Sequence, residues 1–250
     1  MNDLVKKTIQ RLAHICGYEI SKEIPTDFSE QDIQIINYVR PYTMISPERI
    51  FSLIGSVRYV IKNKIPGEIV ECGVWRGGSM MAAAKTLLDL KNQEKELYLF
   101  DTFEGMTKPE KIDVSLSNLN AIKEFDNTKI DTDSSNWCRA TIDDVKSNLF
   151  SLGYDKSKIH FIKGKVEETL PSDKPKSISI LRLDTDWYQS TKHELIHLFP
   201  KLSKGGILII DDYGFWKGSR KAVDEYISEN NIQILLNRID NTGGRIAVKL

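Results

Sequence analysis

Ser177-Ile-Ser-Ile-Leu-Arg-Leu-Asp-Thr-Asp-Trp-Tyr188 is the stretch of sequence that most constrains the fold. It begins as a short run rich in Ile and Leu, which is typical of a buried parallel strand. The run ends abruptly in Asp184 and Asp186. The stretch therefore predicts two carboxylates at the point where a strand leaves a sheet.

A second apolar run, Gly206-Ile-Leu-Ile-Ile210, ends in the same way in Asp211 and Asp212. The residues between the two runs predict a helix. A right-handed strand–helix–strand crossover would make the strands parallel and bring their carboxyl ends to one edge of the sheet. We therefore expect four carboxylates to lie close together.

Such a cluster needs a compensating charge, because two unit charges about 4 Å apart repel by roughly 4 kcal/mol at an effective dielectric constant of about 20. Carboxylates without a Cys or His partner suit a hard cation such as Mg²⁺ or Ca²⁺. The alternative is that these Asp residues are solvated strand ends and helix caps. That alternative explains a single Asp better than two pairs at the ends of consecutive strands.

The composition narrows the class of protein. A chain of 250 residues can hold one large α/β domain, with or without a small helical extension. Lys plus Arg and Asp plus Glu both number 35, which gives no support to nucleic acid or an anionic membrane as a partner. Three scattered cysteines predict a reduced, cytoplasmic protein. No apolar run approaches the roughly 20 residues of a membrane span.

The first 63 residues predict a helical auxiliary region. Apolar residues recur at helical spacing over residues 4–13. We expect this helix to pack against the domain or a partner subunit, which indicates a homo-oligomer, with a helix on a membrane surface as the alternative. A short helix is predicted over residues 30–39. Ser46-Pro47-Glu48-Arg49 then predicts a helix start, with Ser as the N-cap and Pro at the first helical position.

Residues 64–250 predict the main domain, and its first strand leads into a glycine turn. The strand Glu68–Cys72 is followed by Gly73-Val-Trp-Arg-Gly-Gly-Ser79 and a helix to about residue 90. Such a turn lets a ligand approach the backbone and the helix N–H groups closely. The spacing lacks the dinucleotide pattern GxGxxG. It is similar to the ExGxxxG motif of class I S-adenosylmethionine-dependent methyltransferases, although a tight turn without a ligand would look alike.

The second strand, Leu97–Asp101, also ends in an acid. Asp101 is placed to accept hydrogen bonds from the ribose hydroxyls of an adenosine-containing cofactor, or alternatively to cap a turn. Phe103 could pack on the adenine or lie in the core.

The remainder of the chain predicts a sheet of seven strands that alternate with helices. Residues 106–139 are polar and irregular apart from a single Trp137, and we interpret them as a lid or substrate loop, with a disordered insertion as the alternative. Further strands are expected at 159–163, 232–237 and 245–249, the last antiparallel, and further helices at 141–152, 189–198 and 216–230.

His193-Glu-Leu-Ile-His197 matches the HExxH pattern of zinc proteases. The predicted helix that carries it is the crossover between two parallel strands, and only His14 and His160 remain as further His ligands. We therefore do not expect a zinc site.

With these residues assembled, the chain resembles the macrocin O-methyltransferase family, metal-dependent class I enzymes that methylate sugar hydroxyls. The segments that carry the resemblance are Tyr42-Thr-Met-Ile-Ser-Pro-Glu-Arg49, Ile69-Val-Glu-Cys-Gly-Val-Trp-Arg-Gly-Gly-Ser79, Phe100-Asp-Thr-Phe-Glu-Gly-Met106, Leu181-Arg-Leu-Asp-Thr-Asp-Trp-Tyr-Gln-Ser-Thr191 and Ile209-Ile-Asp-Asp-Tyr-Gly214. The resemblance implies an α/β, Rossmann-like methyltransferase fold with helices on both faces of a mostly parallel sheet. The chain departs from the usual family pattern at Thr185 and Trp187.

The resemblance also implies roles for individual residues. Asp184, Asp211 and Asp212 would bind Mg²⁺, and Asp186 would be the general base that takes the proton of the acceptor hydroxyl. The methyl donor, S-adenosylmethionine, would be held by residues from three segments, namely Thr43, Met44, Glu71, Gly73, Gly77, Ser79, Asp101 and Phe103.

The predicted function is thus Mg²⁺-dependent O-methylation of a sugar hydroxyl on a glycan, a nucleotide sugar or a glycosylated natural product. An NAD(P)-dependent oxidoreductase is an alternative, but the sequence lacks the GxGxxG pattern that such an enzyme needs. A non-catalytic domain that binds the donor is a further alternative, which would not need all four Asp residues.

Overall fold

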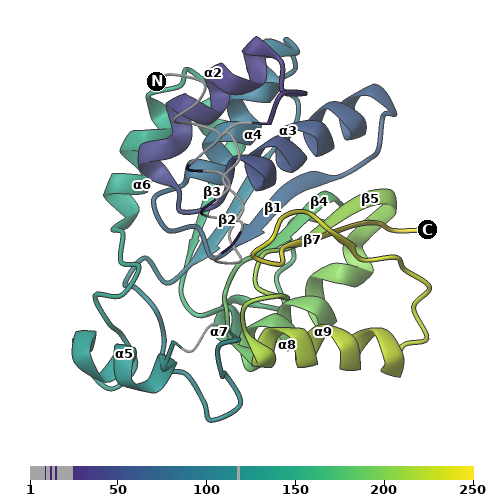
Figure 1. The fold of residues 1–250 in the computed structure, drawn as a ribbon. Coiled ribbons are helices and arrows are strands. Elements are labelled where there is room, and N and C mark those ends of the chain that lie inside the picture. Colours follow the sequence, from purple (N-terminus) through teal and green to yellow (C-terminus); the bar gives the residue numbers. More distant parts are fainter. Residues whose placement is uncertain (1–8, 10–11, 13–14, 16–24, 117–118) are drawn as a thin grey trace.

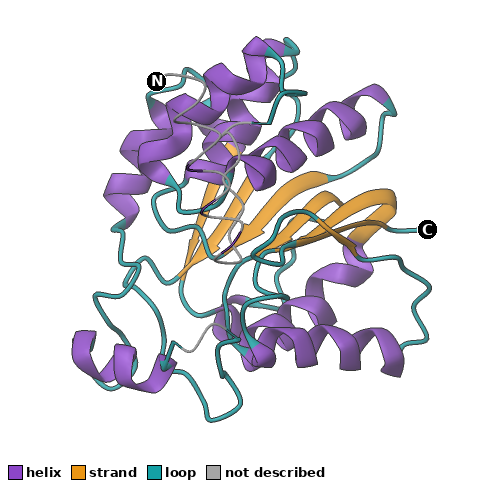
Figure 2. Cartoon of the chain, in the orientation of Figure 1, coloured by secondary structure: helices purple, strands orange, loops and turns teal. Residues whose placement is uncertain are grey.

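The computed structural model describes residues 9, 12, 15, 25–116 and 119–250. Within these residues seven strands form one sheet, in the order β3-β2-β1-β4-β5-β7-β6 (Figure 1, Figure 2). The strands are β1 (Glu68–Cys72), β2 (Leu97–Asp101), β3 (Ile159–Lys163), β4 (Ile178–Leu183), β5 (Leu202–Ile210), β6 (Asn237–Arg238) and β7 (Arg245–Val248). Strands β1 to β5 are parallel, and β7 is antiparallel to β5. The predicted fold class is confirmed.

Helices cover both faces of this sheet (Figure 1). One face carries α2 (Glu30–Val39), α3 (Pro47–Lys62), α4 (Gly78–Asp89) and α6 (Ile142–Phe150), and the other carries α7 (Val166–Thr169), α8 (Tyr188–Leu198) and α9 (Lys217–Glu229). A further helix, α5 (Ala121–Thr128), lies at the side of the molecule.

Two apolar cores result because successive side chains of a strand point to opposite faces. In β1, Ile69 packs with α3 and α4, whereas Val70 and Cys72 pack in the core between the sheet and helices α8 and α9. Such strands are apolar on both faces, which is why they appear in the sequence as continuous apolar runs. The helices α2 and α3 share the first of these cores with the sheet, and the division at residue 63 stays a prediction.

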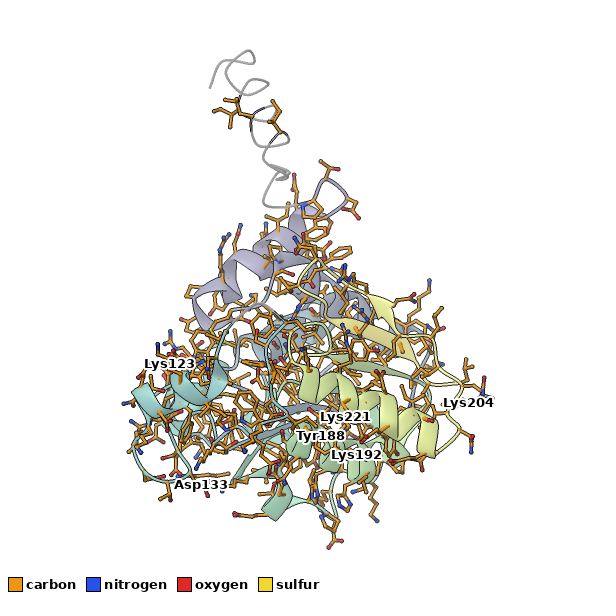
Figure 3. The ribbon with its side chains drawn as sticks, turned by 60° about the horizontal axis from the view of Figure 1, so that its bottom comes forward. Lys123, Asp133, Tyr188, Lys192, Lys204 and Lys221 are labelled. Atoms are coloured by element: carbon orange, nitrogen blue, oxygen red, sulfur yellow. The ribbon has the colours of Figure 1, made fainter. Side chains whose placement is uncertain are left out.

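Helices α8 and α9 lie side by side on the lower face. Tyr188, Lys192 and Lys221 lie near one another on their outer surface (Figure 3). Lys192 pairs with Glu229 at 2.6 Å, and the hydroxyl of Tyr188 donates to Glu225 at 2.6 Å. These contacts link the helix after β4 to the helix after β5.

The hydrogen-bond ladder continues past the ends of three strands and brings their last residues together. The N–H of Gly73 donates to Phe100 at 2.9 Å, and the N–H of Asp184 donates to Cys72 at 2.9 Å. The N–H of Asp211 donates to Leu183 at 2.9 Å. The carboxyl ends of β1, β4 and β5 are therefore level, as the crossover argument predicts.

Most of the predicted helices and strands appear within a few residues of their expected bounds. The last crossover differs, because β6 is confined to Asn237–Arg238 where a strand over residues 232–237 was expected. Helix α5 was not predicted. The amphipathic helix expected over residues 4–13 lies outside the described residues, apart from Ile9 and Leu12.

No helix within the described part of the chain is both long and apolar enough to cross a membrane.

Candidate active site

The four predicted carboxylates meet at the carboxyl edge of the sheet. One oxygen from each of Asp184, Asp211 and Asp212 lies within 4.8 Å of the other two, a spacing that suits a shared cation. Asp211 and Asp212 are buried, and Asp184 is partly exposed. The three residues follow β4 and β5 directly, so the sheet register itself sets their spacing.

Arg182 lies in the middle of this cluster. Its guanidinium donates to Glu71 at 2.6 Å, to Asp184 at 2.7 Å and to Asp211 at 2.6 Å, and its side chain is 4% exposed. One buried cation thus joins the carboxylate of β1 to carboxylates that follow β4 and β5. Pairing of this kind is what makes a buried charge tolerable.

A second arginine reaches the cluster from α3. Arg49 donates to the other oxygen of Asp211 and, through Nε, to Asp240 at 2.9 Å. Asp240 also accepts a hydrogen bond from Ser46 at 2.8 Å. Burial alone would raise the pKa of Asp240, but the hydrogen bond and charge of Arg49 outweigh it and lower that pKa to about 2. Arg49 therefore connects the start of α3, which was predicted at Ser46, to Asp211 of the Asp cluster.

Asp186 occupies an unusual backbone conformation beside the cluster. Its φ is 67°, in the left-handed region that non-glycine residues rarely adopt, which is a feature often found at functional sites. Its N–H donates to Asp212 at 3.0 Å, and its carboxylate accepts a hydrogen bond from the indole N–H of Trp216. Burial raises the pKa of Asp186 to about 8, and the charge of Asp184 adds to that rise. A carboxylate with such a pKa is suited to accept a proton near neutral pH.

The glycine turn after β1 faces the same space. Gly73 has φ 80°, and a Cβ at this position would collide with the carbonyl of Asp184, so only glycine fits between the two strand ends. Gly77 has φ 87° and forms the N-cap of α4, but it faces Val145 of α6 rather than the cleft. Its role is in the turn.

Glu71 lies below this turn and is 1% exposed. Burial raises its pKa to about 8, although the charge of Arg182 opposes that rise. Its second oxygen is buried without a hydrogen-bond partner among the described residues. An unpartnered buried oxygen is costly, so this carboxylate is suited to receive a donor group from a ligand.

A cleft of about 530 Å³ joins these features. Its lining includes all four Asp residues of the cluster together with residues predicted to hold the methyl donor, namely Thr43, Met44, Gly73, Ser79 and Asp101. Ligand pockets usually measure about 300–1,000 Å³, so this cleft has the volume of an ordinary ligand site. The structure therefore brings the predicted metal residues and five of the eight predicted donor residues to one cleft, whereas Glu71, Gly77 and Phe103 do not line it.

Asp101 closes one side of the cleft. Its carboxylate accepts hydrogen bonds from the N–H groups of Val74 at 2.6 Å, Trp75 at 3.2 Å and Phe103 at 2.6 Å. These bonds tie the end of β2 to the glycine turn. The side chain of Phe103 is 3% exposed and packs in the core near Phe161, which favours the core alternative over adenine contact.

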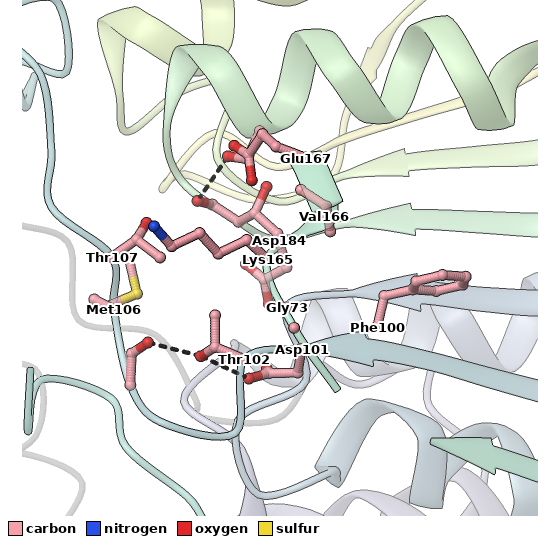
Figure 4. A pocket seen from close by; sticks show the side chains of 14 residues that line it. Gly73, Phe100, Asp101, Thr102, Met106, Thr107, Lys165, Val166, Glu167 and Asp184 are labelled. Atoms are coloured by element: carbon pink, nitrogen blue, oxygen red, sulfur yellow. Dashed lines mark hydrogen bonds between the residues drawn. The ribbon is translucent and has the colours of Figure 1, made fainter. Parts of the chain in front are cut away.

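A second, small opening of about 70 Å³ adjoins Asp101 and Gly73 (Figure 4). Asp101 and Glu167 lie on opposite sides of it, and Lys165 and Val166 belong to its lining. The predicted site residues do not include Lys165, Val166 or Glu167. The available signal was Gly164 directly after β3, because Gly73 likewise directly follows β1 and lines the same opening.

The HExxH segment forms no metal site. The rings of His193 and His197 are 4.4 Å apart at their centroids, and His193 contacts the carbonyl of Leu170 at 3.2 Å. Glu194 instead points inward and accepts a hydrogen bond from Thr185 at 2.9 Å. Over residues 25–116 and 119–250, the group of acids and His that could share an ion is the Asp cluster.

Arg182 is the main residue that the sequence interpretation left without a role. A charged residue inside an apolar run predicts a buried ion pair, because an unpaired buried charge is rarely stable. That signal was present in the opening stretch. Arg49 and Asp240 offered no comparable signal, since they are 191 residues apart.

Comparison with known proteins agrees with the geometry of the cleft. The profile of the macrocin O-methyltransferase family (TylF) matches residues 24–246. The chain is 30% identical over 202 residues to the 8-demethyl-8-(2,3-dimethoxy-alpha-L-rhamnosyl)-tetracenomycin-C 4'-O-methyltransferase of Streptomyces olivaceus, covering 81% of this chain and 74% of that protein. It is 27% identical to the mycinamicin III 3''-O-methyltransferase of Micromonospora griseorubida, covering 96% and 93%.

Among solved structures, the O-methyltransferase NovP superposes with a TM-score of 0.73 at 25% identity, covering 98% of each chain. The calicheamicin methyltransferase CalS11 shares the fold, with a TM-score of 0.62 at 19% identity over 99% and 93%. These relationships rule against the oxidoreductase alternative. The chain belongs to the macrocin O-methyltransferase family and is an S-adenosylmethionine-dependent O-methyltransferase.

Proposed function

We propose that the protein transfers a methyl group to a sugar hydroxyl and that it uses Mg²⁺ to do so. The observation that carries this proposal is the meeting of the glycine turn, the Asp cluster and Asp186 in one cleft. The relative from Streptomyces olivaceus, which is named for an acceptor that carries a rhamnosyl group, supports a sugar as the acceptor class.

The donor would lie along the glycine turn. Thr43, Met44 and Ser79 line this part of the cleft, and the unpartnered oxygen of Glu71 lies beneath it. The first N–H groups of α4 offer hydrogen bonds to a carboxylate such as that of the donor's methionine part. The acidic residue Asp101 suits the ribose hydroxyls.

The cation would be held by Asp184, Asp211 and Asp212. Three carboxylate oxygens within 4.8 Å are the hard ligands that Mg²⁺ prefers, and Arg182 and Arg49 balance the remaining charge. When bound, a divalent cation lowers the pKa of an adjacent hydroxyl.

Asp186 is the base in this proposal. Trp216 and the backbone conformation hold its carboxylate against the cluster, where it can accept the proton of the acceptor hydroxyl. The protein otherwise contributes by positioning the acceptor oxygen, the methyl carbon and the sulfur in line.

Calorimetry tests the donor and the cation separately. We expect S-adenosylhomocysteine to bind the wild-type protein and the Asp184→Ala variant alike in EDTA, and Mg²⁺ to bind the wild type but not Asp184→Ala. Asp133→Ala is the matched control, because the side chain of Asp133 is 57% exposed and pairs with Lys165 rather than with a residue of the cluster. Equal Mg²⁺ binding by Asp184→Ala and the wild type would exclude the metal site, and absent S-adenosylhomocysteine binding would exclude the donor site.

A further inference from the structure

The wall of the cleft beside Asp186 is aromatic. Trp137 and Phe215 line the cleft there and are partly exposed, together with Met106. The donor side of the same cleft carries Ser79 and Asp101 together with Trp75. A ligand that binds against the aromatic side presents a flat apolar face to it.

Trp137 is supported from behind by two buried rings. It packs edge-on against Trp187, with centroids 5.7 Å apart, and against Trp216, with centroids 6.2 Å apart. Trp187 is 4% exposed and Trp216 is 1% exposed, so Trp137 is the member of this trio that a ligand can reach. Rings packed in this edge-to-face geometry hold one another in place.

The backbone of Trp137 is also fixed. The N–H of Met106, which follows β2, donates to the carbonyl of Trp137 at 2.9 Å. The hydroxyl of Ser135 donates to the carbonyl of Met106 at 2.9 Å. These bonds attach the far end of the irregular connection to the end of β2, so the ring stands on a defined support.

Trp216 connects Trp137 to Asp186, the proposed base. Its indole N–H donates to Asp186, and its ring is a direct neighbour of Trp137. A ligand that covers the exposed part of Trp137 would therefore lie within reach of Asp186. Pyranose sugars fit this pair of features, because their C–H groups form an apolar face and their hydroxyls project from the ring edge.

We infer that Trp137 is the platform on which the acceptor sugar packs, and that it positions a hydroxyl of that sugar toward Asp186. The inference rests on the proposed function and adds the acceptor site to it. The sugar can be part of a simple glycoside or of a nucleotide sugar, since the platform contacts only the sugar ring. Trp137 is accordingly a specificity-determining residue.

Oxidation of tryptophan by N-bromosuccinimide, followed residue by residue with peptide mass spectrometry, tests the inference in the wild-type protein. Trp75 and Trp137 are the partly exposed tryptophans that line the cleft, and Trp75 adjoins Asp101 on the donor side. We expect S-adenosylhomocysteine to slow oxidation of Trp75. We expect methyl α-L-rhamnopyranoside or TDP-rhamnose, each in the presence of S-adenosylhomocysteine and Mg²⁺, to slow oxidation of Trp137.

The two residues make the failures distinguishable. Unchanged oxidation of Trp75 with S-adenosylhomocysteine would overturn the proposed donor site. Protection of Trp75 combined with unchanged oxidation of Trp137 under both sugars would overturn the platform alone. Protection of Trp137 by TDP-rhamnose but not by the methyl glycoside would support the platform and identify a nucleotide sugar as the source.

Kinetics with whichever sugar protects Trp137 give a second test. We expect Trp137→Leu to raise the acceptor KM about tenfold, with kcat and the donor KM within about threefold of wild type, because Leu keeps apolar bulk against the buried rings but loses the flat face. Trp137→Phe should recover most of the loss. Tyr38→Ala, which removes an exposed aromatic ring of α2, is the control and should match the wild type. An unchanged acceptor KM in Trp137→Leu would contradict the inference.

Discussion

The carboxylate of Asp113 accepts a hydrogen bond from the backbone N–H of Tyr188, the first residue of α8, at 2.8 Å. Helix α8 has no side-chain cap from its own N-cap residue, so a residue 75 positions earlier supplies one. The other oxygen of Asp113 accepts from the N–H of Glu110 at 2.8 Å. The irregular connection after β2 is thus attached to the helix that follows Asp184 and Asp186.

Asp113→Ala should destabilise the protein by about 1–3 kcal/mol. Asp113 is 4% exposed, and its loss leaves two backbone N–H groups without their partners. Urea unfolding measures the effect, and limited proteolysis should cut the connection 106–139 faster in the variant. Asp133→Ala changes an exposed acid in the same connection and should stay within about 0.5 kcal/mol of wild type.

Asp186→Asn should lower kcat by about 10²–10⁴-fold, which is the usual contribution of a positioned base. The amide keeps the size of the side chain and its contact with Trp216 but cannot accept the proton. Donor affinity, measured by calorimetry with S-adenosylhomocysteine, should stay unchanged, since the Glu71 side of the cleft is intact. A variant with wild-type kcat would show that another group is the base.

The metal-free protein should become less stable as the pH rises from about 4 to about 8. Burial raises the pKa of Asp184 to about 6 and the pKa values of Asp186 and Glu71 to about 8. The folded protein therefore binds more protons than the unfolded chain in this window, and stability falls as those protons are lost.

Thermal unfolding in EDTA and in Mg²⁺ at pH 5, 6.5 and 8 measures this effect. We expect the melting temperature in EDTA to fall across the series, and Mg²⁺ to restore most of it at pH 8, because the cation offsets the same charges. Asp186→Asn, which cannot ionise, should flatten the EDTA series. A metal-free melting temperature that rises with pH would contradict the assignment of raised pKa values.

Arg182→Met should cost about 3–5 kcal/mol of folding free energy at pH 7.5, because it leaves Glu71, Asp184 and Asp211 without their shared partner. Arg182→Lys should lose less, since an ammonium can still pair with part of the set. Arg76→Met is the comparison, because the pair of Arg76 with Asp144 is about one-third exposed and should contribute less than about 1 kcal/mol. Equal losses of folding free energy for the two Met variants in urea unfolding would indicate that the buried ion pairs of Arg182 contribute no more than an exposed pair.

The sheet could be predicted because β1, β2 and β4 are buried almost throughout and because each of these strands ends in a distinct signal. The paired Asp residues after β4 and β5 and the glycine turn after β1 identify the edge where the cleft lies. The parallel direction of β4 and β5 follows from the crossover rule, and the turn at residues 240–244 indicates the antiparallel direction of β7. The order of the strands in the sheet came from the structure.

Residues 232–236 show where such a pattern misleads. Ile232, Ile234 and Leu236 alternate as in a strand, and their side chains do pack against the lower core. Their backbone joins the ladder only from Asn237. Apolar alternation reports which side chains are buried, whereas strand pairing depends on backbone partners elsewhere in the chain.

Helix α5 and the core position of Phe103 were hidden for a related reason. Ala121 and Phe125 are the buried residues of α5, too few for a clear helical period in a polar segment. Phe103 has φ 53° and turns inward at the end of β2, a backbone choice that local sequence does not reveal. The aromatic trio around Trp137 joins residues 50 and 79 positions apart in the chain and so required the structure.

The position of Arg182 has a thermodynamic consequence for the binding of the methyl donor and the cation. Its one guanidinium touches Glu71 beneath the donor side and Asp184 and Asp211 on the cation side. We therefore expect the two ligands to bind with a coupling free energy, and reciprocity requires each to change the affinity of the other by the same factor. The concentration of divalent cation would then set the donor concentration at half-saturation. A low concentration of either ligand would therefore lower the fraction of enzyme that binds the other.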